Sequence, residues 1–441
     1  MKTIKKLVTC FAFLALTMTT VFSVGSAVAK VGNTEYPTFA DALDAWSDGT
    51  TLTLLSDVTV DSTIEVGYGN NNRGSYTLDL NNHGIIFSGD IGSVLFIGEY
   101  KALTMNDSAP TKTDHYIMLE DSRGVNVSDT GTESSTCVKV TGGYITGGNA
   151  HQGGGVEVDY GAIGFTMNAG TIVGNKAQYG GGIDIDWTSA TITGNSKIIK
   201  NTATGSGGGI CTSNGSVLVA DGVQITGNIK HTDTGDIANN VYLGVNDHSP
   251  RIDFFEELNE NARIGVTVDQ RHDRVITRGL CGNTNWASGS VSNFISDDPA
   301  YTVVLNSDGE AALVPCARVT ANDDPNNTGT YYATFYDSTT KYVADANTEV
   351  YYATANENGK LMLTKVENKI IKAGEGVILK STSASIVLAE TSENASYDSI
   401  LTGSDTATTL MNALVLSDGE SGVGFYKYTG SVAAHKAYIS E

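Results

Sequence analysis

The stretch GGGIDIDW at residues 180–187 sets three glycines before a strict alternation of apolar and acidic residues. The stretches GGGVEVDY at residues 153–160 and GGGICTS at residues 207–213 repeat this arrangement, and the glycine runs begin 27 residues apart each time. A fixed period of this length is typical of architectures in which similar units stack on one another. Because the apolar residues recur at every second position, we expect the units to consist of β-strands.

A unit of 27 residues is too short to bury one face of its strands alone, whereas stacked units share a continuous core. We therefore expect a parallel β-solenoid with about 4.8 Å between coils. The glycines fit the corners of the coils, because glycine accepts positive φ and allows close backbone approach. Asparagines that we expect to stack and to hydrogen-bond from coil to coil recur after later strands of the units: Asn149, Asn175, Asn201 and Asn228.

The chain divides into three segments. Residues 1–29 have a basic start, an apolar run and a final small-x-small site, which together are typical of a secretory signal peptide. Alternating strands continue over residues 30–315, the predicted solenoid. In residues 316–441 the 27-residue step is lost, and short Tyr-rich strands separated by turns predict a small antiparallel β-sandwich.

An amphipathic helix is predicted in YPTFADALDAWSDG, near the start of the solenoid. Thr38 can cap this helix, and Phe39, Leu43 and Trp46 share one face of it. The end of a solenoid needs a cover, because an unpaired edge strand invites aggregation. We therefore expect the helix to cap the N-terminal end.

The chain is strongly acidic, with a formal net charge of −22 at pH 7. Such a surface repels nucleic acid and anionic membranes. After the predicted signal peptide, no apolar run is long enough to span a bilayer. We therefore expect an exported monomer, secreted or held at the cell surface, without membrane insertion and without a nucleic-acid partner.

Four acidic residues of the repeat share one face. In VEVD and IDID the apolar residues must point to the core, so the acidic residues point outward. The 27-residue step stacks Glu157 over Asp184 and Asp159 over Asp186. Like charges directly opposite each other are destabilising, so solvent, raised pKa values or a cation must relieve them. Tyr160 and Trp187 continue these strands and should turn the other way unless the strand bends there.

Three interpretations of this acidic patch remain open. It is a hydrated face of an acidic protein, a binding site for a cation or a glycan, or a pair of acid and base carboxylates acting on a sugar. Calcium is the candidate cation, because it favours several oxygen ligands at once. For both the ligand site and the metal site the candidate residues are the same: Glu157, Asp159, Asp184 and Asp186.

The motifs GGGVEV, FTMNAGTIVGNKAQYGGGIDI and ITGNIK resemble the coils of right-handed parallel β-helix proteins of the pectate-lyase-like superfamily, and the GG-[AI]/FxxN repeats of bacterial polymorphic surface proteins. The tail, from YYATFYD through AGEGVILKS to GFYKYTG, resembles a small β-sandwich of bacterial surface proteins. The resemblance implies an all-β fold: a right-handed parallel β-helix with an N-terminal capping helix, followed by a small antiparallel β-sandwich. It implies architecture rather than activity, because this fold hosts lyases, hydrolases and adhesins.

The catalytic motifs of pectin-degrading members of this superfamily are not matched. The nearest segments are NNHG at residues 81–84, which contains His83, and Asp297-Asp298; neither has its companions on neighbouring coils. Arg271, Arg274 and Arg278 around His272 are interpreted as a solvated loop, and His83 as a turn residue.

We therefore expect a bacterial surface protein of adhesin type that binds a polysaccharide or a surface protein rather than catalysing a reaction. The first alternative is a polysaccharide lyase or glycoside hydrolase that uses the acidic patch. The second alternative is a structural spacer. No cofactor is expected to be required, apart from calcium as the candidate cation of the patch.

Overall fold

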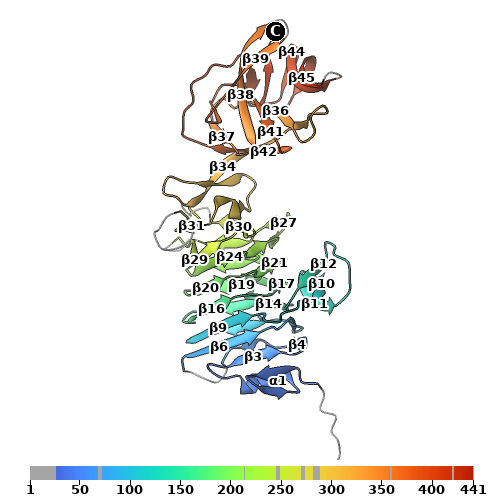
Figure 1. Cartoon of the computed structure of the whole chain (residues 1–441), viewed down its shortest axis with the longest axis vertical. Helices are drawn as coiled ribbons and strands as arrows, with labels where there is room; N and C mark the ends of the chain where they lie inside the picture. Colours follow the sequence, from blue (N-terminus) through green and yellow to red (C-terminus); the bar gives the residue numbers. More distant parts are fainter. Residues whose placement is uncertain are drawn as a thin grey trace, which may run out of the picture.

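The computed structural model describes residues 26–67, 72–212, 214–244, 249–269, 274–281, 289–357, 360–419 and 422–440. Most of the predicted signal peptide, residues 1–25, lies outside the described residues. The described part is an elongated all-β molecule in which stacked parallel strands are followed by antiparallel sheets (Figure 1). The predicted fold class, a parallel β-solenoid followed by antiparallel sheets, is therefore confirmed. None of the helices in this part of the chain is long and apolar enough to cross a membrane.

Four rows of parallel strands run along the solenoid. The first row consists of β3 (Thr51–Leu54), β6 (Gly74–Asp79), β9 (Lys101–Asn106), β16 (Gly164–Met167), β20 (Ser189–Ile192), β24 (Ser216–Asp221), β29 (Ile252–Leu258) and β31 (Thr277–Arg278). The second row consists of β5 (Ile64–Glu65), β8 (Leu95–Ile97), β15 (Val156–Val158), β19 (Ile183–Ile185), β23 (Ile210–Thr212) and β28 (Val241–Leu243).

The third row is joined to the second at β30. It consists of β4 (Val58–Val60), β7 (Gly84–Phe87), β13 (Tyr144–Thr146), β17 (Thr171–Val173), β21 (Lys197–Ile199), β25 (Gln224–Thr226), β30 (Arg263–Val268) and β32 (Phe294–Ser296), which follows the short helix η1 (Val291–Asn293). The short fourth row consists of β14 (Asn149–Gln152), β18 (Lys176–Tyr179), β22 (Thr202–Ser206) and β26 (Ile229–Thr232), to which β27 (Gly235–Ala238) adds an antiparallel strand.

The coils stack in the predicted phase. Val156 pairs with Ile183 and Ile183 with Ile210, and all three side chains are fully buried in one core cluster. The glycine corners also fulfil the predicted role. Gly180 has a φ of +63°, and a Cβ on Gly182 would lie 2.6 Å from the carbonyl oxygen of Gly209 in the next coil. No other residue fits such a corner without moving the neighbouring backbone.

An asparagine ladder connects the coils. The side-chain amide of Asn175 donates to Asn201, which donates to Asn228, each over 3.0 Å, and all three are fully buried. The ladder continues through Asn240 to Asp297. Asn149 is not part of it, because its amide donates to the carbonyl oxygen of Asp90 instead.

The N-terminal end begins with the antiparallel strands β1 (Ala29–Val31) and β2 (Thr34–Tyr36), and β1 also pairs with β3. Helix α1 (Phe39–Ala45) forms where it was predicted, and Thr38 accepts a hydrogen bond from the backbone N–H of Asp41. The helix has only seven residues and buries only Ala42, so a helical cap is not evident. Antiparallel strand β2 instead forms the edge of the sheet.

A three-stranded antiparallel sheet projects from the solenoid (Figure 1). It consists of β10 (Asp114–Glu120), β11 (Arg123–Ser128) and β12 (Cys137–Thr141). Its apolar side, with Ile117 and Val138, packs against Tyr144 and Val173 of the third row. The 27-residue period gives no sign of this insertion.

The C-terminal region contains three antiparallel sheets. The first consists of β33 (Tyr301–Leu305), β34 (Ala311–Thr320), β42 (Ser385–Glu390), β37 (Tyr342–Ala344) and β40 (Ile370–Ile371). The second consists of β35 (Asn322–Asp323), β36 (Tyr331–Phe335), β41 (Val377–Ser381), β38 (Thr348–Glu357) and β39 (Lys360–Lys365). The third consists of β43 (Thr402–Ser404), β46 (Lys436–Ile439), β44 (Thr408–Gly419) and β45 (Gly422–Val432).

Two apolar clusters lie between these sheets. One joins the first sheet to the second, and the other joins the second to the third, so the region has one layer more than a two-sheet sandwich. Strand β34 runs without a break through residue 316, where the second domain was predicted to begin. It pairs with β33 before that residue and with β42 after it.

Candidate functional site

The acidic patch lies on the outer side of β15 and β19. Glu157 pairs with Asp184 across the two parallel strands, as the 27-residue step predicts. Asp159 and Asp186 follow at equivalent strand ends, because the backbone N–H of each donates to the coil below, to Ile97 and Val158 respectively. The structure therefore brings the four predicted residues onto one face.

Asp184 does not face water, and in this respect the prediction from the alternation is wrong. Its neighbours Ile183 and Ile185 point to the core, so its side chain is on the outer side of the strand, but the residue is only 6% exposed. The side chain of Gln152 from β14 donates a 3.1 Å hydrogen bond to it, and Cys211 of the next coil lies against it. Side chains of neighbouring strands therefore cover this carboxylate.

Raised pKa values relieve the repulsion between the stacked acids. Burial raises the pKa of Asp184 from 3.8 to about 6, and the adjacent Asp186 adds to the shift. Burial also raises the pKa of Glu157, which accepts a 3.1 Å hydrogen bond from the hydroxyl of Ser93. The pKa of Asp186 is raised by burial and by the charge of Asp159.

The shift of Asp184 predicts a pH-dependent stability. The folded chain binds this proton more tightly than the unfolded chain, so the stabilisation is complete below pH 3.8 and is lost as the pH rises through about 6. Asp184→Asn, which carries no charge, should therefore be more stable than the wild type at pH 8, by at most about 3 kcal/mol. The two proteins should converge near pH 4. Urea denaturation at both pH values measures this difference, with the exposed Asp233→Asn as control. Equal pH dependence in the wild type and Asp184→Asn would contradict the shift.

A row of exposed aromatic rings lies beside the acidic patch. The aromatic row consists of Tyr100, Tyr160 and Trp187, which are 47%, 64% and 54% exposed. Tyr160 and Trp187 each come two residues after the paired residues Val158 and Ile185, so they occupy the same position in consecutive coils. Tyr160 and Trp187 therefore follow one another along the solenoid axis, one coil apart, and Tyr100 lies on the preceding coil, one residue beyond the equivalent position.

Local backbone geometry exposes these rings. Trp187 has a φ of +53° and Tyr100 a φ of +65°, which is uncommon for residues other than glycine. Strand β19 ends at Ile185 and the backbone bends at Trp187, so the Trp187 side chain is exposed instead of pointing to the core as a continued alternation would require. The backbone N–H of Tyr100 donates a 2.9 Å hydrogen bond to the carbonyl of Gly161, which ties its turn to that of Tyr160. Tyr160 and Trp187 are 27 residues apart, a signal already visible in the sequence.

The acidic patch is not gathered around a point. Among the described residues, only Asp337, Asp405 and His435 bring three ligand atoms within 4.8 Å of one another. A calcium ion held by three or more of Glu157, Asp159, Asp184 and Asp186 would require their side chains to move. In the described conformation the patch offers Asp159 and Asp186 to solvent and keeps Asp184 covered.

Three of the other residues considered from the sequence make contacts within the fold. Asp297 accepts hydrogen bonds from Asn240 and ends the asparagine ladder. The ring of His83 lies 3.6 Å from Asp57, and Arg278 forms a two-bond pair with Asp253. Arg271 and His272 lie outside the described residues. The segment NNHG at residues 81–84 and the pair Asp297-Asp298 do not come together in one site.

No protein-family model matches this chain, and no curated protein or solved structure proved similar to it.

Proposed function

We propose that the chain is an exported, non-catalytic surface protein of adhesin type, and that the aromatic row with Asp159 and Asp186 binds a glycan. The observation that carries this proposal is the row itself: three large rings on consecutive coils stay exposed beside solvent-accessible carboxylates. Exposed apolar side chains gathered at one place mark interaction sites. Two of these rings, Tyr160 and Trp187, recur at the same position of the repeat.

The chemistry of the two groups suits sugars. A sugar ring presents an apolar C–H face, which packs against an aromatic ring, and hydroxyl groups, which donate hydrogen bonds to carboxylates. A glycan chain lying along the solenoid axis would meet one ring per coil, at intervals of about 4.8 Å. The acidic surface would repel uronate polymers. Neutral polysaccharides and amino-sugar polymers are therefore the proposed ligands, and a glycosylated surface protein would present the same chemistry.

One observation favours the alternative of a carbohydrate-active lyase or hydrolase. A carboxyl group with a pKa of about 6, as in Asp184, is suited to general acid catalysis. However, a general acid must reach the glycosidic oxygen, and Asp184 is 6% exposed beneath Gln152 and Cys211. Binding without turnover is the better-supported function.

A panel of immobilised neutral, amino-sugar and uronate polysaccharides tests the proposal. The protein without its signal peptide should bind one or more neutral or amino-sugar members, with no release of reducing ends or unsaturated products. The amount of protein bound should be the same in EDTA as in calcium if the aromatic row is responsible for binding. Cleavage of a panel member would support the enzyme instead. The absence of binding across the panel would reject glycan recognition.

A further inference from the structure

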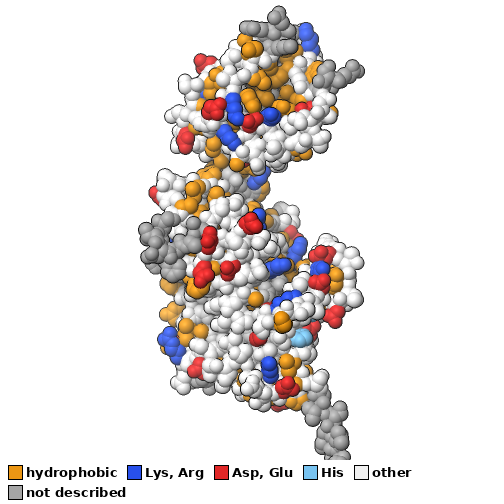
Figure 2. Space-filling view, in the orientation of Figure 1, with side chains coloured by type: hydrophobic (Ala, Val, Ile, Leu, Met, Phe, Trp, Pro, Cys, Tyr) orange, Lys and Arg blue, Asp and Glu red, His pale blue; other side chains and the backbone are white. Residues whose placement is uncertain are grey.

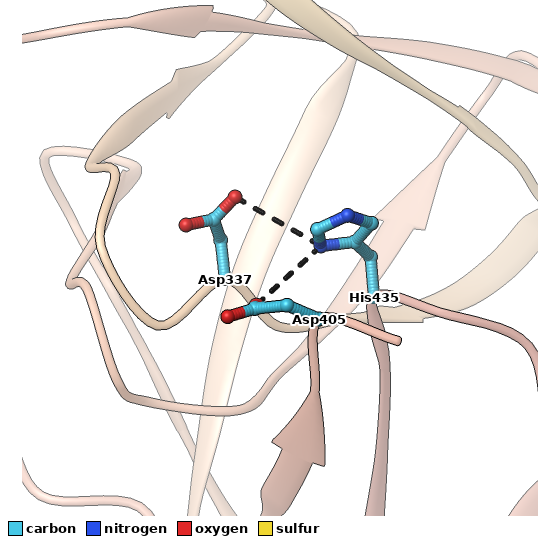
Figure 3. Close-up of side chains that lie close together, drawn as sticks. All are labelled: Asp337, Asp405 and His435. Atoms are coloured by element: carbon cyan, nitrogen blue, oxygen red, sulfur yellow. Dashed lines mark ion pairs between the residues drawn. The ribbon is translucent and has the colours of Figure 1, made fainter. Parts of the chain in front are cut away.

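Three loops of the C-terminal sheets bring together two carboxylates and an imidazole (Figure 3). Asp337 follows β36, Asp405 lies between β43 and β44, and His435 lies between β45 and β46. The Nδ1 atom of His435 is 3.8 Å from Oδ2 of Asp337 and 3.7 Å from Oδ1 of Asp405. The carbonyl oxygen of Tyr336 lies 3.1 Å from the same nitrogen. Three oxygens from two other loops thus lie within 3.8 Å of Nδ1 of His435, and ligand atoms of the two carboxylates and the imidazole all lie within 4.8 Å of one another.

Hydrogen bonding to His435 does not account for the approach of the two carboxylates. At 3.7 and 3.8 Å, neither carboxylate is within hydrogen-bond range of Nδ1. If Nδ1 of His435 carried a proton, it would donate its hydrogen bond to the carbonyl oxygen of Tyr336, which is the nearest acceptor. In contrast, ligands about 2.1 Å from a tetrahedral zinc ion lie about 3.4 Å from one another. The separations of 3.1, 3.7 and 3.8 Å from Nδ1 to the three oxygens bracket that value.

Each side chain is oriented by further contacts. The Oδ1 atom of Asp337 accepts the backbone N–H groups of Thr339 and Thr340, which leaves Oδ2 facing His435. Both oxygens of Asp405 are held by Ser338, Oδ1 through its backbone N–H over 3.0 Å and Oδ2 through its hydroxyl. The ring of His435 stacks on Phe335. Supporting hydrogen bonds of this kind fix the ligands of metal sites.

The cluster opens into a pocket of about 300 Å³. Asp337 and His435 line this pocket, together with Phe335, Tyr342 and Lys436. The pocket leaves room for water or another oxygen ligand to complete the coordination of an ion.

We propose that Asp337, Asp405, His435 and the carbonyl of Tyr336 form a binding site for a divalent cation of the first transition row, with Zn²⁺ as the best match. Imidazole favours transition metals over calcium and magnesium, and carboxylate oxygens accept zinc at similar distances. The site is separate from the aromatic row and does not depend on the proposed glycan binding. The alternative occupant of the cluster is a proton on His435, which would tie the loops together without a metal.

Zn²⁺ titration of the untagged protein by calorimetry, with metal analysis after desalting, tests this site. We expect one tightly bound equivalent in the wild type. Asp405→Asn and His435→Gln should lose it, and Ser338→Ala, which removes only a supporting hydroxyl, should weaken binding about tenfold. His231→Gln is the matched control, because His231 and Asp236 form an exposed pair, with Nδ1 and Oδ1 2.7 Å apart, that could hold adventitious zinc.

The outcomes distinguish a bound metal ion from a proton on His435. Loss of the equivalent in Asp405→Asn, with retention in His231→Gln, supports the site. Circular dichroism of each variant checks folding, and Ser338→Ala decides the matter if both ligand variants unfold. A wild type that binds no zinc, or whose zinc is lost only in His231→Gln, overturns the proposal. Preference for Ca²⁺ over Zn²⁺ overturns the assignment of the metal.

Discussion

Replacement of Asn201 by alanine should lower the free energy of unfolding by about 3–5 kcal/mol. The side chain is fully buried. Its carbonyl oxygen accepts the backbone N–H and the side-chain amide of Asn175, each over 3.0 Å. Its own amide donates to the carbonyl of Ile172 over 2.9 Å and to Asn228. Alanine would remove all four bonds and leave the buried backbone N–H of Asn175 without its acceptor, whereas the Asn175 amide would keep its bonds to the carbonyls of Ile145 and Val173. A buried group that loses its partner costs about 1–3 kcal/mol.

Urea denaturation followed by circular dichroism measures this loss. Asn195→Ala is the matched control, because Asn195 lies in the same coil but is exposed. The control should change the free energy of unfolding by no more than about 0.5 kcal/mol. If Asn201→Ala were as mild as Asn195→Ala, the ladder would not stabilise the stacking of the coils.

The solenoid could be predicted because its signals are local and repeat. Each coil carries its own glycine corner and its own alternation, and the constant step fixes which residues pair, such as Ile183 with Ile210. The ends of the ladder could not be predicted in this way. Asn240 follows Asn228 by 12 residues, and Asp297 follows Asn240 by 57. Loops of unequal length separate them, so the period no longer points to them.

The C-terminal region and the projecting sheet lack such signals. Strands β10 to β12 interrupt the coils without any period of their own, and they are held by apolar contacts such as Ile117 with Tyr144. Short turns in the tail predict antiparallel strands, but pairing among distant strands decides how many sheets they form. The cluster of Asp337, Asp405 and His435 depends on that pairing, so the spacing of these three residues in the sequence does not predict that they lie together.

The candidate site was predicted in part. The outward side of β15 and β19 follows from alternation alone, whereas the burial of Asp184 depends on Gln152, which belongs to another strand. Exposure of Trp187 depends on its positive φ, which the alternation of apolar and acidic residues does not encode. The 27-residue spacing of Tyr160 and Trp187 was visible in the sequence. That both side chains are exposed could not be predicted without the backbone bend at Trp187.

Removal of Tyr160 and Trp187 from the aromatic row should abolish most glycan binding. Stacking on one ring contributes on the order of 1.4 kcal/mol, which corresponds to about tenfold in affinity. Trp187→Ala should therefore weaken binding about tenfold, and Tyr160→Ala with Trp187→Ala about a hundredfold. Both side chains are more than half exposed, so folding should be unaffected. Phe255→Ala is the matched control, because Phe255 is 45% exposed on the solenoid but lies outside the row.

Calorimetric affinity of the strongest-binding glycan for the Tyr160→Ala and Trp187→Ala double variant tests the central claim most directly. The account predicts a dissociation constant about a hundredfold above that of the wild type, while Phe255→Ala stays within about twofold. A double variant that is folded and binds the glycan as tightly as the wild type would contradict the account.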